Sequence, residues 1–149
     1  MGAVFWLILL ALVAGACLPT QAGINAQLNL WTRSPVLTAA ISFGVGTLAL
    51  VIYAIANRTP MPVRAAMPEL PWWVWIGGVL GAFFVASTVV LAPRLGAAAM
   101  VALIIAGQMT ASLVLDHFGW LGYPMQPLNL WRIGGMGLVV AGVVMIRAF

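Results

Sequence analysis

Long apolar runs, separated by short polar or proline-containing segments, dominate the chain. Five of them are each about as long as the roughly 20 residues that a helix needs to cross the roughly 30 Å hydrocarbon core of a bilayer. They extend approximately over residues 3–26, 36–56, 72–91, 95–115 and 130–146. The runs are continuous rather than alternating, so they predict membrane-spanning helices and not the strands of a barrel.

The segments between the runs predict where the chain turns. Pro35 follows Arg33 and Ser34 and suits the start of the second helix. Residues 57–71 contain four prolines, which exclude a continuous helix and predict the longest loop. Residues 92–94 predict a tight turn, and residues 116–127 predict a second substantial loop. None of these segments is long enough to divide domains, so residues 1–149 are expected to form a single five-helix membrane domain.

Composition strengthens this interpretation. Hydrophobic residues make up 64% of the 149 positions and charged residues 5%. Soluble domains are typically about 45–50% apolar and about 25% charged. A soluble fold of this length could not bury so many apolar side chains, so lipid must be the solvent for most of the surface. Trp72, Trp73 and Trp75 open the third run, where a cluster of indoles suits the headgroup layer.

The few charges and the lone cysteine exclude several classes. Six basic residues against two acidic ones give a net charge of +4. The basic residues are arginines isolated at the ends of the runs, which favours contact with lipid headgroups and argues against nucleic-acid binding. Cys17 is the only cysteine, so an intramolecular disulfide is impossible. Although residues 14–17 loosely resemble a cleavage box, no basic residue precedes the apolar run, so a cleaved signal is not expected.

The arginines also bear on orientation. With five crossings, loops alternate between the two sides of the membrane. Three arginines fall on each side: Arg58, Arg64 and Arg132 on the side of the N-terminus, and Arg33, Arg94 and Arg147 on the other. Since the distribution of Lys and Arg orients membrane proteins, this balance predicts insertion in both directions and pairing of opposed copies. The alternative is one orientation, set by a partner or by unequal arginine positions.

Side chains suited to catalysis are scarce. The chain has one His, one Asp, one Glu and one Cys, and none of the common nucleophile, phosphate-binding or zinc motifs. Asp116 and His117 are adjacent, so on a helix they point about 100° apart and do not form a ready-made dyad. We therefore expect no enzyme activity, no bound metal and no cofactor.

Polar residues inside the runs are the candidates for function, because an unpaired polar group is costly in a low-dielectric bundle. Gln21 and Asn25 are four residues apart and share a helix face near the end of the first run. Gln108 is the most central polar residue of the fourth run, and Ser112 lies one turn further along its face. These four residues predict a substrate cavity. The alternative is that they form hydrogen bonds between helices and fix the bundle, or lie at the membrane interface.

No carboxylate falls in the middle of a run, so proton or cation exchange on a central acidic residue is not supported. Asp116 lies at the end of the fourth run, where it is expected to anchor the helix at the interface; the alternative is a pair with Arg132 or with an arginine of a partner subunit. Ser42 and Thr110 are expected to bond to their own helices. The fifth run is rich in small residues and is the predicted dimer contact.

Two motifs resemble a known group of transporters. Residues 94–99, the apolar helix that follows, and the glycine-rich segment 132–142 resemble the last two helices of a drug/metabolite transporter half. The segment 21–28, Gln-Ala-Gly-Ile-Asn-Ala-Gln-Leu, together with the length and the five runs, is similar to the YdcZ-like five-helix family of that superfamily. The larger relatives typically have a proline inside the penultimate helix and a glutamate at its end, where this chain has Gly107, Gln108 and Asp116.

The resemblance implies a multi-pass protein of the bacterial inner membrane. It also implies half of an inverted-repeat fold, which two opposed copies would complete as an antiparallel dimer. The predicted function is transport of an unidentified small molecule or metabolite by alternating access, with the lipid bilayer and a second copy, or a homologous paralogue, as partners. The competing hypothesis is a non-transporting membrane scaffold or one half of an obligate heterodimer, with the loop at 57–71 as a docking element.

Overall fold

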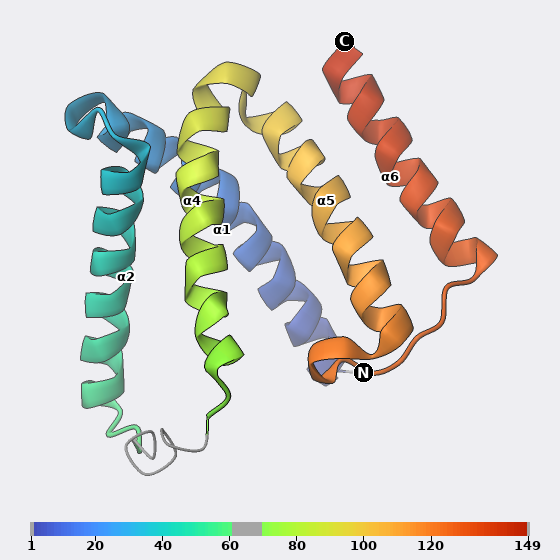
Figure 1. The fold of residues 1–149 in the computed structure, drawn as a ribbon, viewed down its shortest axis with the longest axis horizontal. Coiled ribbons are helices and arrows are strands. Elements are labelled where there is room, and N and C mark those ends of the chain that lie inside the picture. Colours follow the sequence, from blue (N-terminus) through green and yellow to red (C-terminus); the bar gives the residue numbers. More distant parts are fainter. Residues whose placement is uncertain (1, 61–69, 149) are drawn as a thin grey trace. The chain divides into compact units, whose positions relative to one another are not determined.

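The structure is a computed structural model that describes residues 2–60 and 70–148. The remainder of the proline-rich loop, with Arg64 and Glu69, lies outside the described residues, and so does the docking role considered for it. Every regular element in the described ranges is helical, which confirms the all-α class (Figure 1). The elements are α1 (Gly2–Thr32), α2 (Pro35–Ala56), η2 (Trp72–Trp75), α4 (Ile76–Leu95), α5 (Ala97–Phe118), η3 (Trp120–Gly122) and α6 (Leu130–Ala148).

The lengths of the five long helices fit a bilayer. Four helical segments are long and apolar enough to cross it: Val4–Thr32, Pro35–Ala56, Trp72–Leu95 and Ala97–Phe118. The apolar part of α6, Leu130–Ile146, is shorter. At 1.5 Å per residue the 19 residues of α6 extend over about 28 Å, close to the thickness of the hydrocarbon core. The five predicted helices are therefore all present.

Contacts divide the chain into two compact units, residues 1–93 and residues 94–149. The first unit contains α1, α2 and most of α4, and the second contains α5 and α6. In both units large apolar side chains are exposed along the helices, among them Phe5 and Phe83 in the first and Leu138 in the second. Lipid is the solvent that accommodates such surfaces.

The first helix is longer than the sequence predicted, because α1 continues from residue 26 to Thr32. The polar residues after position 26 favour water or headgroups over the hydrocarbon core, but they do not interrupt the backbone hydrogen bonds of the helix. The helix ends where Arg33 adopts a left-handed conformation with φ of 51°, and where Pro35 disfavours the helical region for Ser34. The Ser34 side chain then accepts a hydrogen bond from the Leu37 amide and caps α2.

The turn between α4 and α5 is also displaced from its predicted position at residues 92–94. Helix α4 continues through Pro93 to Leu95, because the loss of one N–H donor this close to a helix end does not terminate the helix. The chain turns at Gly96, whose φ of 76° and ψ of 161° suit glycine alone. The fourth helix therefore begins at Ala97 rather than at residue 95, and it extends to Phe118 rather than to residue 115.

A hydrogen-bonded cluster joins α1 to α2 near their connection. Thr38 is fully buried, and its hydroxyl lies 2.6 Å from the hydroxyl of Thr32. The Thr38 hydroxyl also donates to Oδ1 of Asn29 over 3.4 Å. Asn29 thus serves the packing of the first unit, which is one of the two roles considered for polar residues on this helix.

Helices α2 and α4 run side by side in the first unit (Figure 1), and Gly81 in the second turn of α4 lies against the ring of Phe43 of α2. A Cβ atom added at Gly81 would lie 3.3 Å from Cζ of Phe43, closer than an ordinary contact. The Gly77-x-x-x-Gly81 spacing therefore has one member at a close contact, whereas Gly77 has open space around it. In this unit the small residue makes room for an aromatic ring rather than for a second backbone.

In the second unit, polar groups hold the loop between α5 and α6. Arg132 forms an ion pair with Asp116, as the sequence suggested, and also donates to the carbonyl of Gln126 over 2.7 Å. The amide of Gln126 donates to the Asp116 carbonyl over 2.7 Å. Two further contacts tie the same loop: Nδ1 of His117 accepts from the Leu128 amide, and Oδ1 of Asn129 accepts from the Arg132 amide. Asp116 and His117 thus serve the loop and do not face each other as a catalytic pair.

Candidate functional site

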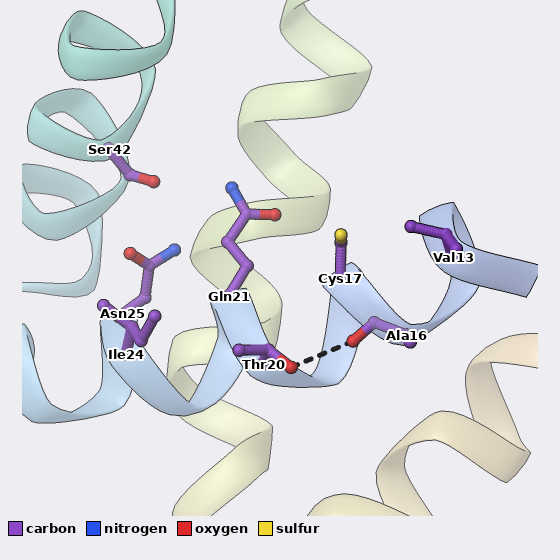
Figure 2. A pocket seen from close by; sticks show the side chains of 8 residues that line it. All are labelled: Val13, Ala16, Cys17, Thr20, Gln21, Ile24, Asn25 and Ser42. Atoms are coloured by element: carbon purple, nitrogen blue, oxygen red, sulfur yellow. Dashed lines mark hydrogen bonds between the residues drawn. The ribbon is translucent and has the colours of Figure 1, made fainter. Parts of the chain in front are cut away.

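The predicted residues Gln21 and Asn25 line a groove of about 520 Å³ on one face of α1 (Figure 2). Figure 2 shows their carboxamides projecting from the helix toward the side on which Ser42 of α2 lies. The groove is lined by Val13, Ala16, Cys17, Thr20, Gln21, Ile24, Asn25 and Ser42. The four-residue spacing of Gln21 and Asn25 predicted that they share a helix face, and in the structure both line this groove.

The α1 part of this lining follows from helical geometry. Positions 13, 16, 17, 20, 21, 24 and 25 repeat with spacings of three and four residues, the pattern of a single helix face. Pro19 lies inside α1 without ending it. The Thr20 hydroxyl donates to the Ala16 carbonyl over 2.9 Å and so is satisfied within its own helix. Polar groups that remain free to meet a ligand therefore come from other positions.

Asn25 is the most unusual residue of the groove. Its side chain is only 3% exposed, and its Nδ2 is fully buried with no hydrogen-bond partner among the described residues. A buried donor left unpaired typically costs about 1–3 kcal/mol, which is why such groups are rare in native proteins. Gln21, one turn earlier, is exposed, so the two amides of the lining differ in burial.

Cys17 and Ser42 belong to the groove although the sequence did not single them out for it. Cys17 was interpreted as a small apolar helix residue, and it is a free, exposed thiol on the lining. Its position four residues before Gln21 on the same face was the signal that could have found it. Ser42 was expected to bond within α2, and only the pairing of α1 with α2 places it at the groove.

The other two predicted site residues lie in the second unit. Gln108 and Ser112 are exposed on α5, four residues apart and therefore on one face of that helix. The Thr110 hydroxyl donates to the Ala106 carbonyl of its own helix over 2.8 Å, as expected. Gln108 and Ser112 remain predictions for substrate contact.

The described part of the chain contains no group of three or more His, Cys, Asp or Glu side chains able to hold a metal. The eight residues of the groove carry no formal charge. Their chemistry is that of two amides, two hydroxyls and one thiol set among apolar side chains. Such a surface can bind and orient a solute.

Five apolar helices with a polar groove on the first define a polytopic helical membrane protein. The chain belongs to the family described as "Putative inner membrane exporter, YdcZ", which matches residues 6–145. It is 36% identical over 136 residues to the "Inner membrane protein YdcZ" of Escherichia coli (strain K12), an alignment that covers 91% of each chain. No solved structure matches this chain.

Membership of this family confirms the resemblance seen in residues 21–28 and 132–142. The protein is a multi-pass protein of the bacterial inner membrane, and the description of its family names an exporter. The coarse prediction of a membrane transport protein is thus supported. The substrate, the assembly and the transport cycle belong to the proposal that follows.

Proposed function

We propose that this protein transports a small molecule across the inner membrane as an antiparallel dimer working by alternating access, with the α1 groove as its substrate site. The observation that carries the proposal is the buried, unpartnered amide of Asn25 at a groove lined by Gln21 and Ser42. A ligand that pairs with this amide would recover the free energy that the empty protein forgoes.

The contrast with Asn29 supports a role in binding rather than in packing. Both asparagines lie on α1, four residues apart. Asn29 accepts a hydrogen bond from Thr38 and helps to join α1 to α2. If Asn25 served the same purpose, its amide should also have a partner, whereas Nδ2 has none. A transporter site, which must alternate between bound and empty, is where an unsatisfied polar group is tolerated.

The antiparallel arrangement is supported by helix number and by charge. With five crossings, Arg58 and Arg132, in or next to the connections after α2 and α5, fall on one side, and Arg33 and Arg94, in or next to the connections after α1 and α4, fall on the other. Adding Arg64 and Arg147 from the sequence gives three arginines on each side. A chain with no net bias can insert both ways, and two opposed copies rebuild the inverted repeat typical of transporters.

Alternating access predicts counterflow, and this is the deciding experiment. Proteoliposomes are loaded with unlabelled N-acetyl-L-phenylalaninamide, a neutral amide with an apolar body, and a trace of the radiolabelled compound is added outside. A carrier produces a transient overshoot of internal label that empty liposomes do not show. We expect this overshoot with the wild-type protein, and its loss in Asn25→Leu.

The matched control is Gln27→Leu, which removes an exposed amide from the same helix at a position outside the groove lining. Gln27→Leu should retain the overshoot. Gln108→Leu and Ser112→Ala, tested in the same assay, decide whether the predicted positions on α5 take part. Absence of any overshoot with the wild-type protein, in either orientation of the protein in the liposome membrane, would contradict transport of this compound class.

A further inference from the structure

We infer that the α1 groove selects uncharged, mainly apolar molecules that carry a hydrogen-bond acceptor, and that Nδ2 of Asn25 is the donor that recognises this acceptor. The inference deepens the proposed function and rests on the same groove. It concerns what the groove binds, which can be measured without transport.

The polar groups of the groove differ in whether they are free to pair with a ligand. Thr20 is committed to the Ala16 carbonyl, so its hydroxyl proton is already used. Nδ2 of Asn25 is buried without a partner, and it can only donate. Gln21 is exposed, and Ser42 faces the groove from α2 (Figure 2). A ligand atom that pairs with this buried N–H must therefore accept a hydrogen bond.

A charge on the ligand would be costly in this groove. The groove lining consists of apolar side chains, amides, hydroxyls and one thiol, with no carboxylate and no basic group. A charged ligand would lose its hydration there and gain no counter-ion, which is unfavourable in a low-dielectric environment. A neutral carbonyl or ether has far less hydration to lose, and a hydrogen bond from the Asn25 amide replaces the lost bond to water.

The size and shape of the groove also bear on its ligand. The groove of about 520 Å³ is bounded by Val13, Ala16 and Ile24 as well as by the polar groups. Most of the lining surface is apolar, and small-molecule sites commonly combine a mostly apolar surface with a few directed polar groups, in volumes of about 300–1,000 Å³. A molecule with one aromatic or branched apolar body and one or two amide-like groups matches this arrangement.

The test compares three probes with one body. N-acetyl-L-phenylalaninamide is neutral, N-acetyl-L-phenylalanine is an anion and N,N,N-trimethyl-L-phenylalaninamide is a permanent cation. Binding of each labelled probe to the detergent-solubilised protein is measured by equilibrium dialysis. We expect the neutral probe to bind at least about tenfold more tightly than either ion, and to lose about tenfold in affinity in Asn25→Leu but not in Gln27→Leu.

Cys17 locates the bound probe. As the only cysteine of the chain and part of the groove lining, it reports occupancy without any engineered thiol. The neutral probe should slow alkylation of Cys17 by N-ethylmaleimide in the wild-type protein and in Gln27→Leu. Alkylation that proceeds at the same rate with saturating probe bound would place the probe elsewhere and overturn the inference.

A charge exchange gives a positive readout. Asn25→Asp retains the size of the side chain and introduces a carboxylate at this buried position of the groove lining. At a pH well above the carboxyl pKa, this variant should favour the cationic probe over the neutral one, reversing the wild-type order. An unchanged order of affinities in Asn25→Asp would exclude Asn25 as the recognition element.

The outcomes separate this inference from the proposed function. Selective binding of the neutral probe without counterflow would support the inference and contradict transport. Counterflow of the cationic or anionic probe by the wild-type protein would support transport and contradict the inference. Equal binding of all three probes, or binding indifferent to Asn25→Leu, would also contradict the inference.

Discussion

Arg132, in the first turn of α6, forms an ion pair with Asp116 in the last turn of α5. The two side chains are 24% and 23% exposed, so the pair is partly shielded from solvent. Arg132 also donates to the Gln126 carbonyl, and Gln126 returns a hydrogen bond to the Asp116 backbone. Arg132 of α6 therefore binds both the end of α5, through Asp116, and the loop that connects the two helices, through Gln126.

Loss of Arg132 should loosen this connection. Arg132→Met removes the ion pair and the hydrogen bond to Gln126 and leaves the Asp116 carboxylate without its partner. We expect the free energy of unfolding in detergent to fall by about 1–3 kcal/mol. Asp116→Asn should cost less, because Arg132 keeps its bond to Gln126. A double-mutant cycle with no coupling between the two positions would contradict the role assigned to the pair.

Removing the buried hydroxyl of Thr38 should weaken the contact between α1 and α2. Thr38→Val has nearly the same shape but leaves Thr32 and Asn29 without their shared partner. We expect a loss of about 1–2 kcal/mol, seen as a lower midpoint of thermal unfolding. The control is Thr110→Val, whose hydroxyl bonds only to its own helix and which should be nearly neutral. Equal effects of the two substitutions would contradict this interpretation.

Gly96 should tolerate no side chain. Its φ of 76° and ψ of 161° lie in a region that only glycine adopts readily, so Gly96→Ala should cost about 1–3 kcal/mol. Gly107 lies inside α5 with open space around it. Gly107→Ala should therefore be neutral or stabilise the protein by up to about 1 kcal/mol. Thermal unfolding of the two variants in the same detergent compares them, and a harmless Gly96→Ala would contradict the turn described for this glycine.

Apolar run length was sufficient to predict the number of helices, but not their ends. A bilayer imposes a hydrophobic length, and this length is readable in residues 36–56 or 72–91. Helix ends depend instead on backbone conformation at single residues. Arg33 ends α1 and Gly96 ends α4 through positive φ angles, and hydrophobicity carries no information about these angles.

The candidate site was predictable along one helix only. The four-residue spacing of Gln21 and Asn25 placed them on one face, and extending that face backward leads to Cys17. Ser42 could not be assigned to the groove, because its place there depends on which segment of α2 packs against α1. The missing partner of Asn25 was equally unreadable, since the sequence reveals a polar residue but not whether its hydrogen bonds are satisfied.

The balance of arginines makes orientation sensitive to single substitutions. Arg58→Gln removes one of three arginines from the side of the N-terminus, which should then face the periplasm more often and leave the C-terminus in the cytoplasm. Arg94→Gln should do the opposite. C-terminal fusions to a fluorescent protein, active in the cytoplasm, and to alkaline phosphatase, active in the periplasm, measure the two populations. Wild-type activity on one side only would remove the antiparallel homodimer.

Substitution of Asn25 by Leu should change stability and ligand binding in opposite directions. In the empty protein, the buried Nδ2 has no partner, so Asn25→Leu removes an unsatisfied donor and adds apolar surface of similar volume. We expect the variant to unfold at a higher temperature than the wild type, by about 1–3 kcal/mol in free energy, while it loses the neutral probe. A residue that fixes the bundle would show the reverse, because its substitution would lower stability. Thermal unfolding measured with and without N-acetyl-L-phenylalaninamide separates the two cases: the probe should stabilise the wild-type protein and Gln27→Leu but leave Asn25→Leu unchanged.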